Sequence, residues 1–180
     1  MTRPRIDVLI SADDIAVRVE ALARDIVADM PGEILVVVIL KGSFVFAADL
    51  IRALERVGAS AQVDFITLSS YRHGTSGGAV QVTHDLSEDV AGRDVLIVED
   101  ILESGRTLAF AGDHLTRRGA ASVRSCLLLD KPEKRRVAVE ADYVGFTIGP
   151  EFVVGYGLDL AHRYRGLPYI GVVAGENDDV

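Results

Sequence analysis

The sequence contains one cysteine in 180 residues, and this scarcity excludes two kinds of structure. Cys126 cannot form a disulfide within the chain or supply a cysteine pair to a zinc site, and its apolar neighbours predict a buried strand residue. Long apolar segments are also missing, because runs such as 34–40 are far shorter than the ~20 residues that cross a bilayer. The opening MTRPRIDVLI lacks the apolar region and cleavage site of an export signal. We therefore expect a cytoplasmic protein with no membrane span and no membrane partner.

Positive charge is scarce as well, since 19 lysines and arginines stand against 27 aspartates and glutamates, which leaves a net charge of −8. Such a surface repels nucleic acid unless basic residues gather in one place. The densest basic cluster, at 131–136, is short and has no interleaved aromatic side chains. We therefore expect no nucleic-acid partner.

Several common motifs for metals and nucleotides are absent. The four histidines show no metal-ligand spacing, and no HExxH motif occurs. The chain has no GxxxxGK[ST] phosphate loop, and the GYG at 155–157 lacks the third glycine of a dinucleotide fingerprint.

What the sequence does contain is an alternation of helix and strand signals. Ser11 and Asp14 resemble a capping box, and apolar residues at helical spacing follow them, which predicts a helix near 12–29. The pattern also predicts these elements: strands at 33–40, 62–71, 94–100 and 122–130, a helix capped by Ser43 that runs to about Val57, and a helix after the third of these strands that ends near Arg118. This order is typical of an α/β fold with a mainly parallel central sheet flanked by helices. No repeat or linker interrupts it, so we expect a single domain over residues 1–180.

Polar and small residues follow three of the predicted strands. Lys41 and Gly42 follow the first, Glu99 through Thr107 end the third, and Lys131 follows the fourth. Ligands of such sheets bind at the carboxyl ends of the strands, so we expect these three loops to form one site.

The turn at 103–107 has the features of an anion site. Gly105 lets the backbone approach a ligand, while Ser104 and Thr107 offer hydroxyl groups. The start of a helix adds free backbone N–H groups and about half a positive charge. A monophosphate would suit this turn.

Two adjacent acids, Glu99 and Asp100, precede the turn. A ligand that uses both would be a polyol such as ribose, or hydrated Mg²⁺. The alternative is structural: Asp100 caps the next helix and Glu99 faces solvent. Local chemistry therefore reaches a ribose phosphate, with or without magnesium, and no further.

The segment VLIVEDILESGRTL resembles the phosphoribosyl pyrophosphate (PRPP) motif of type I phosphoribosyltransferases. Other segments are similar to the hypoxanthine-guanine phosphoribosyltransferase family: LKGSFVFAADL at 40–50, SSY at 69–71, LLLDKP at 127–132 and FVVGYGLDLAHRYRGLPYIG at 152–171. They span nearly the whole chain in the family's order. The resemblance implies the type I phosphoribosyltransferase fold, with a small hood for the purine base formed by the N-terminal segment and residues about 140–180.

The resemblance also implies how PRPP is bound. Glu99 and Asp100 match the residues that hold the ribose hydroxyls and Mg²⁺, and the residues matched to the 5′-phosphate are Ser104, Gly105, Arg106 and Thr107. Lys41 and Gly42 match the residues that face the pyrophosphate, and Arg165 matches the arginine that grips this leaving group. Asp159 matches an acid near a second Mg²⁺. The family commonly has a cis peptide bond just before the lysine. Ser70 and Tyr71 match the start of a lid that closes over the site.

For the purine, Lys131 is the most informative match. A lysine has only donors, so it would pair with O6 of hypoxanthine or guanine and meet the amino group of adenine donor to donor. By the resemblance, Phe152 would stack on the base, the Val153 backbone would read its edge, and Asp159 would lie near its 2-position. Without the resemblance, Lys131 beside Pro132 would be a surface turn residue and Phe152 a core residue.

Glu103 departs from the family, which more often carries aspartate here as the proposed general base that meets purine N7. The glutamate is one methylene longer, an extra reach of ~1.5 Å. We still expect a base role for Glu103, so the matched catalytic residues are Glu103, Lys131 and Arg165.

The resemblance implies a purine salvage enzyme that uses Mg²⁺ and transfers the phosphoribosyl group of PRPP to N9 of hypoxanthine or guanine, giving IMP or GMP and pyrophosphate. Homodimers or homotetramers are expected from the same resemblance. Two alternatives remain open. One is a PRPP-sensing, RNA-binding regulator of the same fold, which would need a basic face, and the other is an enzyme that prefers xanthine.

Overall fold

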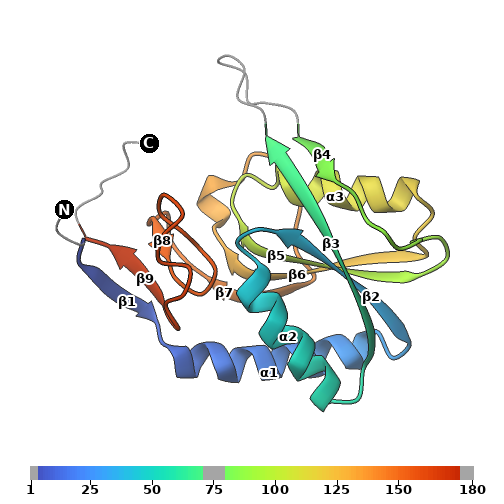
Figure 1. Cartoon of the computed structure of the whole chain (residues 1–180), viewed down its shortest axis with the longest axis horizontal. Coiled ribbons are helices and arrows are strands. Elements are labelled where there is room, and N and C mark those ends of the chain that lie inside the picture. The colour runs from blue at the N-terminus through green and yellow to red at the C-terminus, as the bar shows by residue number, and fades with distance from the viewer. Residues whose placement is uncertain (1–3, 71–79, 175–180) are drawn as a thin grey trace.

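The structure, a computed structural model, describes residues 4–70 and 80–174 (Figure 1). Its helical elements are α1 (Ala12–Asp29), α2 (Phe44–Arg56), α3 (Arg106–Arg117) and the short 3-10 helix η1 (Pro132–Lys134). Its strands are β1 (Ile6–Ile10), β2 (Glu33–Leu40), β3 (Ser60–Ser70), β4 (Val80–His84), β5 (Asp94–Leu102), β6 (Ser122–Asp130), β7 (Tyr143–Thr147), β8 (Val153–Val154) and β9 (Ile170–Val173). In the described part of the chain, no helix is both long and apolar enough for a membrane span.

Six strands form the main sheet, in the order β4-β3-β2-β5-β6-β7. Among the described residues of this sheet, only the β3–β4 pair is antiparallel, so the predicted α/β fold with a mainly parallel sheet is confirmed. Strands β2 and β5 lie at its centre, and they are apolar runs because helices cover both of their faces.

Alternate residues of β2 face two different clusters of buried side chains. Val36 and Val38 pack with residues of α1 and α2, whereas Leu35 and Val37 pack with residues of α3. Helices α1 and α2 lie side by side across one face (Figure 1), and α3 covers the other. An unbroken apolar strand is therefore required at this position of the sheet.

The predicted helices are present, and their starts differ in how they are capped. Ser11 accepts a hydrogen bond from the Asp14 N–H at 3.1 Å, as the capping box predicts, and its hydroxyl donates to the Asp14 carboxylate at 2.6 Å. Ser43 is the residue before α2, but the prediction that its side chain caps the helix is wrong. Its hydroxyl bonds the Ile39 carbonyl instead, because residue 43 has helical φ and ψ angles and its side chain lies over the preceding strand end.

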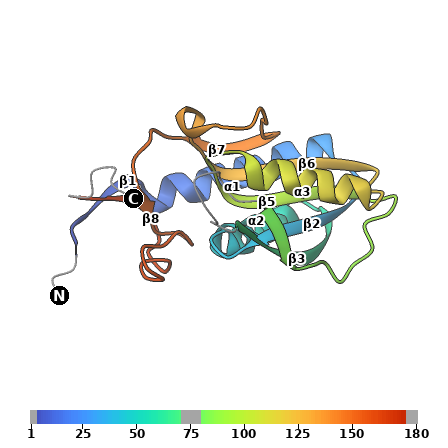
Figure 2. The same cartoon turned by 90° about the horizontal axis from the view of Figure 1, so that it is seen from above.

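A second, smaller sheet joins the two ends of the described chain. Its strand order is β1-β9-β8, and the pairing of β1 with β9 is antiparallel, from Ile6 with Val173 to Ile10 with Ile170. Both views place this sheet at one end of the molecule, beyond the carboxyl ends of the central strands (Figure 2). The strand β7 belongs to the main sheet, where it pairs with β6.

Cys126 lies on β6 and is fully buried, which confirms the sequence prediction. Burial raises the pKa of its thiol far above the ordinary value, so the reactive thiolate does not form near neutral pH. We expect no reaction with an alkylating reagent at pH 8 until the protein unfolds, followed by modification of one thiol per chain in denaturant. Mass spectrometry after timed labelling checks this, and rapid labelling of the folded protein would contradict it.

Candidate functional site

The carboxyl ends of β2, β5 and β6 meet at one cavity of about 440 Å³. The residues that line it include nine of those predicted from the sequence: Lys41, Gly42, Asp100, Glu103, Lys131, Phe152, Val153, Asp159 and Arg165. A second cavity of about 210 Å³ adjoins the first and contains Glu99, Ser104, Gly105 and Thr107. The structure therefore brings the three predicted loops together with the segment that precedes β9.

Lys131 is buried in this site, with 3% of its surface exposed. Its Nζ donates to Glu103 Oε1 at 2.8 Å and to the Glu151 carbonyl at 2.8 Å. The interpretation of Lys131 as a surface turn residue is therefore wrong, because Glu103 and Glu151 supply the partners that a buried ammonium group needs. The result is a fixed cationic donor on the wall of the cavity.

The acid pair begins with Glu99, which is 6% exposed. Its Oε2 atom is buried and has no hydrogen-bond partner among the described residues. Burial, followed by the neighbouring charge of Asp100, raises the pKa of Glu99 well above its ordinary value. The alternative in which Glu99 faces solvent is therefore wrong. A buried acceptor without a partner is most easily explained by a ligand that supplies a cation or a hydroxyl group.

Asp100 borders both cavities. Burial raises its pKa to about 6, against the opposing effects of backbone N–H groups, including that of Ile101, and of Arg165. The Ile101 N–H donates to Asp100 Oδ1 at 3.0 Å. Asp100 does not cap α3, whose N-cap residue is Gly105, so that part of the structural alternative is also wrong.

The loop after β2 packs directly against Asp100. A Cβ atom at Gly42 would lie 1.6 Å from Asp100 Oδ2, so any side chain at this position would displace Asp100. The peptide bond between Leu40 and Lys41 is cis, as the resemblance led us to expect.

The turn before α3 packs against residues 136–139 on its outer side. Gly105 has a φ of 82°, and a Cβ there would lie 2.6 Å from Val139 Cγ1. The Ser104 carbonyl accepts hydrogen bonds from the N–H groups of Arg136 and Val137, both at 3.0 Å. The N-cap residue Gly105 has no side chain, and the Arg106 N–H donates to Ser104 Oγ at 3.4 Å. The start of α3, with its partial positive charge, borders the smaller cavity. Of the predicted phosphate residues, the Arg106 side chain is exposed and lines neither cavity.

Arg165 and Asp159 form an ion pair on the wall of the larger cavity. Arg165 Nη2 lies 2.6 Å from Asp159 Oδ1, and Arg165 Nη1 donates to the Gly157 carbonyl at 2.6 Å. The other Asp159 oxygen accepts from the His162 N–H at 2.7 Å. The position of the Arg165 guanidinium is therefore set by contacts within its own loop, and it lines the same cavity as Asp100.

Phe152 is 41% exposed, so the interpretation of this side chain as a core residue is wrong. It borders the larger cavity next to Val153, which is buried in β8. An exposed aromatic ring beside a buried donor is an arrangement that suits a flat heterocyclic ligand.

Some residues of the site escaped sequence reasoning. The following residues line the larger cavity but were not predicted as site residues: Leu40, Thr67, Leu68, Ile101 and Leu158. Thr67 pairs with Leu40 across the sheet, so the end of β3 reaches the site as a fourth strand. The strand itself was predicted, but its position beside β2 depends on the sheet order. Of the predicted lid residues, Ser70 ends β3, and Tyr71 lies outside the described residues.

The protein groups alone do not make a closed metal site. Among residues 4–70 and 80–174, no group of three or more His, Cys, Asp or Glu side chains is arranged to hold a metal ion. Mg²⁺ commonly takes only one or two carboxylates from the protein and its other ligands from substrate phosphates and water. Glu99, with its unpartnered buried oxygen, and Asp100 fit that mode.

The fold is that of a phosphoribosyltransferase, and comparison with known families agrees. The family model described as "Phosphoribosyl transferase domain" matches residues 10–160. The chain therefore belongs to the phosphoribosyltransferase family.

Within this family, the chain is similar to proteins named as hypoxanthine or hypoxanthine-guanine phosphoribosyltransferases and to bifunctional TilS/HprT proteins. The chain is 46% identical over 172 residues to the hypoxanthine phosphoribosyltransferase of Escherichia coli, and the match covers 93% of this chain and 95% of that protein. A crystal structure of a hypoxanthine-guanine phosphoribosyltransferase from Bacillus anthracis has a TM-score of 0.87 and 44% identity, covering 95% of this chain and 99% of that one. The bifunctional protein TilS/HprT of Listeria innocua is 50% identical over 94% of this chain, which spans 26% of the length of that relative.

Proposed function

We propose that this protein transfers the 5-phosphoribosyl group of PRPP to N9 of hypoxanthine or guanine, forming IMP or GMP and pyrophosphate. The observation that carries the proposal is the position of Lys131. This buried ammonium group lines the same cavity as Asp100, and the adjoining turn offers a phosphate site. The names of the similar proteins support the same reaction.

The base is selected by hydrogen bonding at its 6-position. Lys131 offers only N–H donors, and its position is held by hydrogen bonds to Glu103 and Glu151. It therefore donates a hydrogen bond to a purine that has a carbonyl oxygen at the 6-position. Adenine would place an amino group there and leave buried donors unpaired, at a cost of ~1 to 3 kcal/mol. Phe152 stacks on the base, the Val153 backbone reads its edge, and Asp159 lies near its 2-position.

The phosphoribosyl group is held by the acid pair and the turn. Glu99 and Asp100 accept hydrogen bonds from the ribose hydroxyls, and the N–H and hydroxyl groups of Ser104, Gly105 and Thr107 bind the 5′-phosphate. Arg106 contributes its backbone, since its side chain is exposed. Mg²⁺ bound with PRPP, with Glu99, Asp100 and Asp159 as candidate protein partners, would offset charge on the pyrophosphate.

During transfer, the bond from C1′ to the pyrophosphate oxygen breaks as N9 attacks from the opposite face. Glu103 lines the cavity beside Lys131 and accepts the purine proton at N7. Arg165, with the backbone of Lys41 and Gly42, stabilises the charge that develops on the leaving pyrophosphate.

We include in the proposal a lid that begins at Ser70 and Tyr71, a cytoplasmic location, and a homodimer or homotetramer.

A panel of four purines tests the proposal. With PRPP and Mg²⁺, we expect nucleotide formation from hypoxanthine and guanine, and a kcat/KM for adenine that is lower by roughly 10- to 100-fold, because Lys131 has no acceptor to meet. Xanthine also carries O6, so its rate shows whether the 2-position is selective. Chromatography of the products gives each rate. Turnover of adenine at the rate of hypoxanthine would contradict the role of Lys131, and no turnover of any purine would contradict the proposed function.

A further inference from the structure

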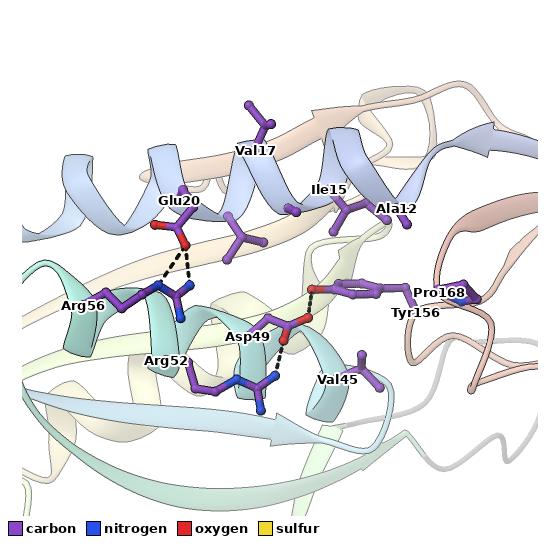
Figure 3. A pocket seen from close by; sticks show the side chains of 12 residues that line it. Ala12, Ile15, Val17, Glu20, Val45, Asp49, Arg52, Arg56, Tyr156 and Pro168 are labelled. Atoms are coloured by element: carbon purple, nitrogen blue, oxygen red, sulfur yellow. Dashed lines mark hydrogen bonds and ion pairs between the residues drawn. The ribbon is translucent and has the colours of Figure 1, made fainter.

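Tyr156 lies outside the catalytic cavity but within the segment that carries Arg165. It stands between Gly155 and Gly157, is 6% exposed, and has a φ of 49°, which is uncommon for a residue with a side chain. Its hydroxyl donates to Asp49 Oδ2 on α2 at 2.5 Å, as Figure 3 shows. The backbone conformation and the hydrogen bond together direct this side chain away from its own loop and onto the helix.

Besides this hydrogen bond, the ring packs in the hydrophobic core, but it does not fill the space around it. One side of Tyr156 borders an apolar cavity of about 610 Å³ between α1 and α2, together with Ile15, Val45 and Pro168 (Figure 3). Burial, and then the hydrogen bond to Asp49, raises the pKa of the Tyr156 hydroxyl well above its ordinary value, so it remains the donor. Asp49 also forms an ion pair with Arg52 on the exposed side of α2.

The backbone on both sides of Tyr156 is bound to the Arg165 segment. The Tyr156 N–H donates to the Leu167 carbonyl at 2.9 Å, and the Gly157 N–H donates to the Arg165 carbonyl at 2.9 Å. The Gly157 carbonyl accepts from the Arg165 guanidinium. A Cβ at Gly157 would lie 2.0 Å from the Gly42 carbonyl, so this loop is in direct contact with the loop that follows β2.

These contacts connect two groups that the proposed function places on the pyrophosphate. Lys41 and Gly42 lead into α2, which carries Asp49, while Arg165 is bound to the backbone next to Tyr156. We infer that Tyr156 is a positioning residue: its bond to Asp49 sets the place of the Arg165 loop against the Lys41–Gly42 loop, and so the geometry of the pyrophosphate site. The inference rests on the proposed function and names a residue outside the cavity that serves it.

The test separates the pyrophosphate site from the purine site. Tyr156→Phe removes only the hydroxyl, and we expect the KM for PRPP to rise roughly tenfold, because small displacements of binding groups weaken binding strongly. The KM for hypoxanthine at saturating PRPP should stay within about twofold of the original protein. Titration calorimetry with PRPP and Mg²⁺ should show the same loss of affinity without purine present.

A matched control is available in Tyr143, whose hydroxyl donates to Asp29 Oδ2 at 3.0 Å in another part of the fold. Tyr143→Phe should leave both KM values unchanged, even if it lowers the melting temperature. Asp49→Ala should reproduce the effect of Tyr156→Phe, and the double variant should show no further rise, as expected for two residues acting through one bond.

Two results would overturn the inference: a Tyr156→Phe protein with the original KM for PRPP, or equal rises in the KM values of both substrates. If Tyr156→Phe does not fold, the same split in KM is read from Asp49→Ala. The original protein, assayed alongside, reports separately on the proposed function, since it must form IMP whatever the variants do.

Discussion

Glu103→Gln is expected to lower kcat by roughly 100-fold or more while PRPP still binds with its original affinity. Glutamine has nearly the same shape as glutamate, but it cannot take up the purine proton, and general-base catalysis typically contributes about 10²- to 10⁴-fold. The change also removes the anionic partner that lies 2.8 Å from the buried Lys131 ammonium. Steady-state kinetics with hypoxanthine, combined with calorimetric titration of PRPP, measures the two effects separately.

Two comparisons make this result specific. Glu133→Gln removes an exposed acid on η1, two residues after Lys131, and should leave kcat unchanged. Glu103→Asp keeps a carboxylate and should retain most of the turnover, although the shorter side chain lengthens the approach to Lys131. Near-normal kcat in Glu103→Gln would remove Glu103 from the mechanism.

Asp100→Asn is expected to stabilise the ligand-free protein at pH 8 and to abolish PRPP binding. The pKa of Asp100 is raised from 3.8 to about 6, chiefly by burial, so the folded protein binds this proton more tightly than the unfolded chain does. Its contribution to stability is therefore present at low pH and is lost as the pH rises from about 4 to 6. Above that range the ionised carboxylate costs the fold on the order of 3 kcal/mol, which asparagine does not incur.

Scanning calorimetry between pH 4 and pH 8 measures this difference. The melting temperatures of the variant and the original protein should coincide near pH 4 and separate by roughly 5 to 10 °C at pH 8. Asp113→Asn, on the exposed surface of α3, should produce no such separation. A variant that is less stable than the original protein at pH 8 would mean that the Asp100 carboxylate supports the fold rather than straining it.

The sequence predicts the central layers of this fold because burial leaves a strong local signal there. The residues of β2 from Ile34 to Val38 are fully buried, so both faces of the strand must be apolar. Helix α1 shows its buried stripe directly in its spacing. The strands that escaped prediction, β1, β4, β7, β8 and β9, have at most five residues each, and pairs such as β1 with β9 join distant parts of the chain.

The same distinction applies to the site. The acid pair and the phosphate turn are contiguous in sequence, so local chemistry was enough to predict a ribose phosphate. Lys131 shows the opposite case, because its burial depends on Glu151 and Glu103, and neither contact has a local signature. Arg165 and Tyr156 depend on backbone turns that only the folded loop reveals. Family resemblance suggested the placement of Arg165. The placement of Tyr156 is visible in the structure alone.

The pairing of Ile6 with Val173 has a practical consequence for rearranging the chain. Because the first and last described strands run antiparallel and adjacent, a short linker could join them, and new termini could be opened at Gly119, between α3 and β6. That turn lies at the amino edge of the main sheet, opposite the cavity. A circular permutant built in this way would keep every strand pairing and leave the substrate entrance unobstructed.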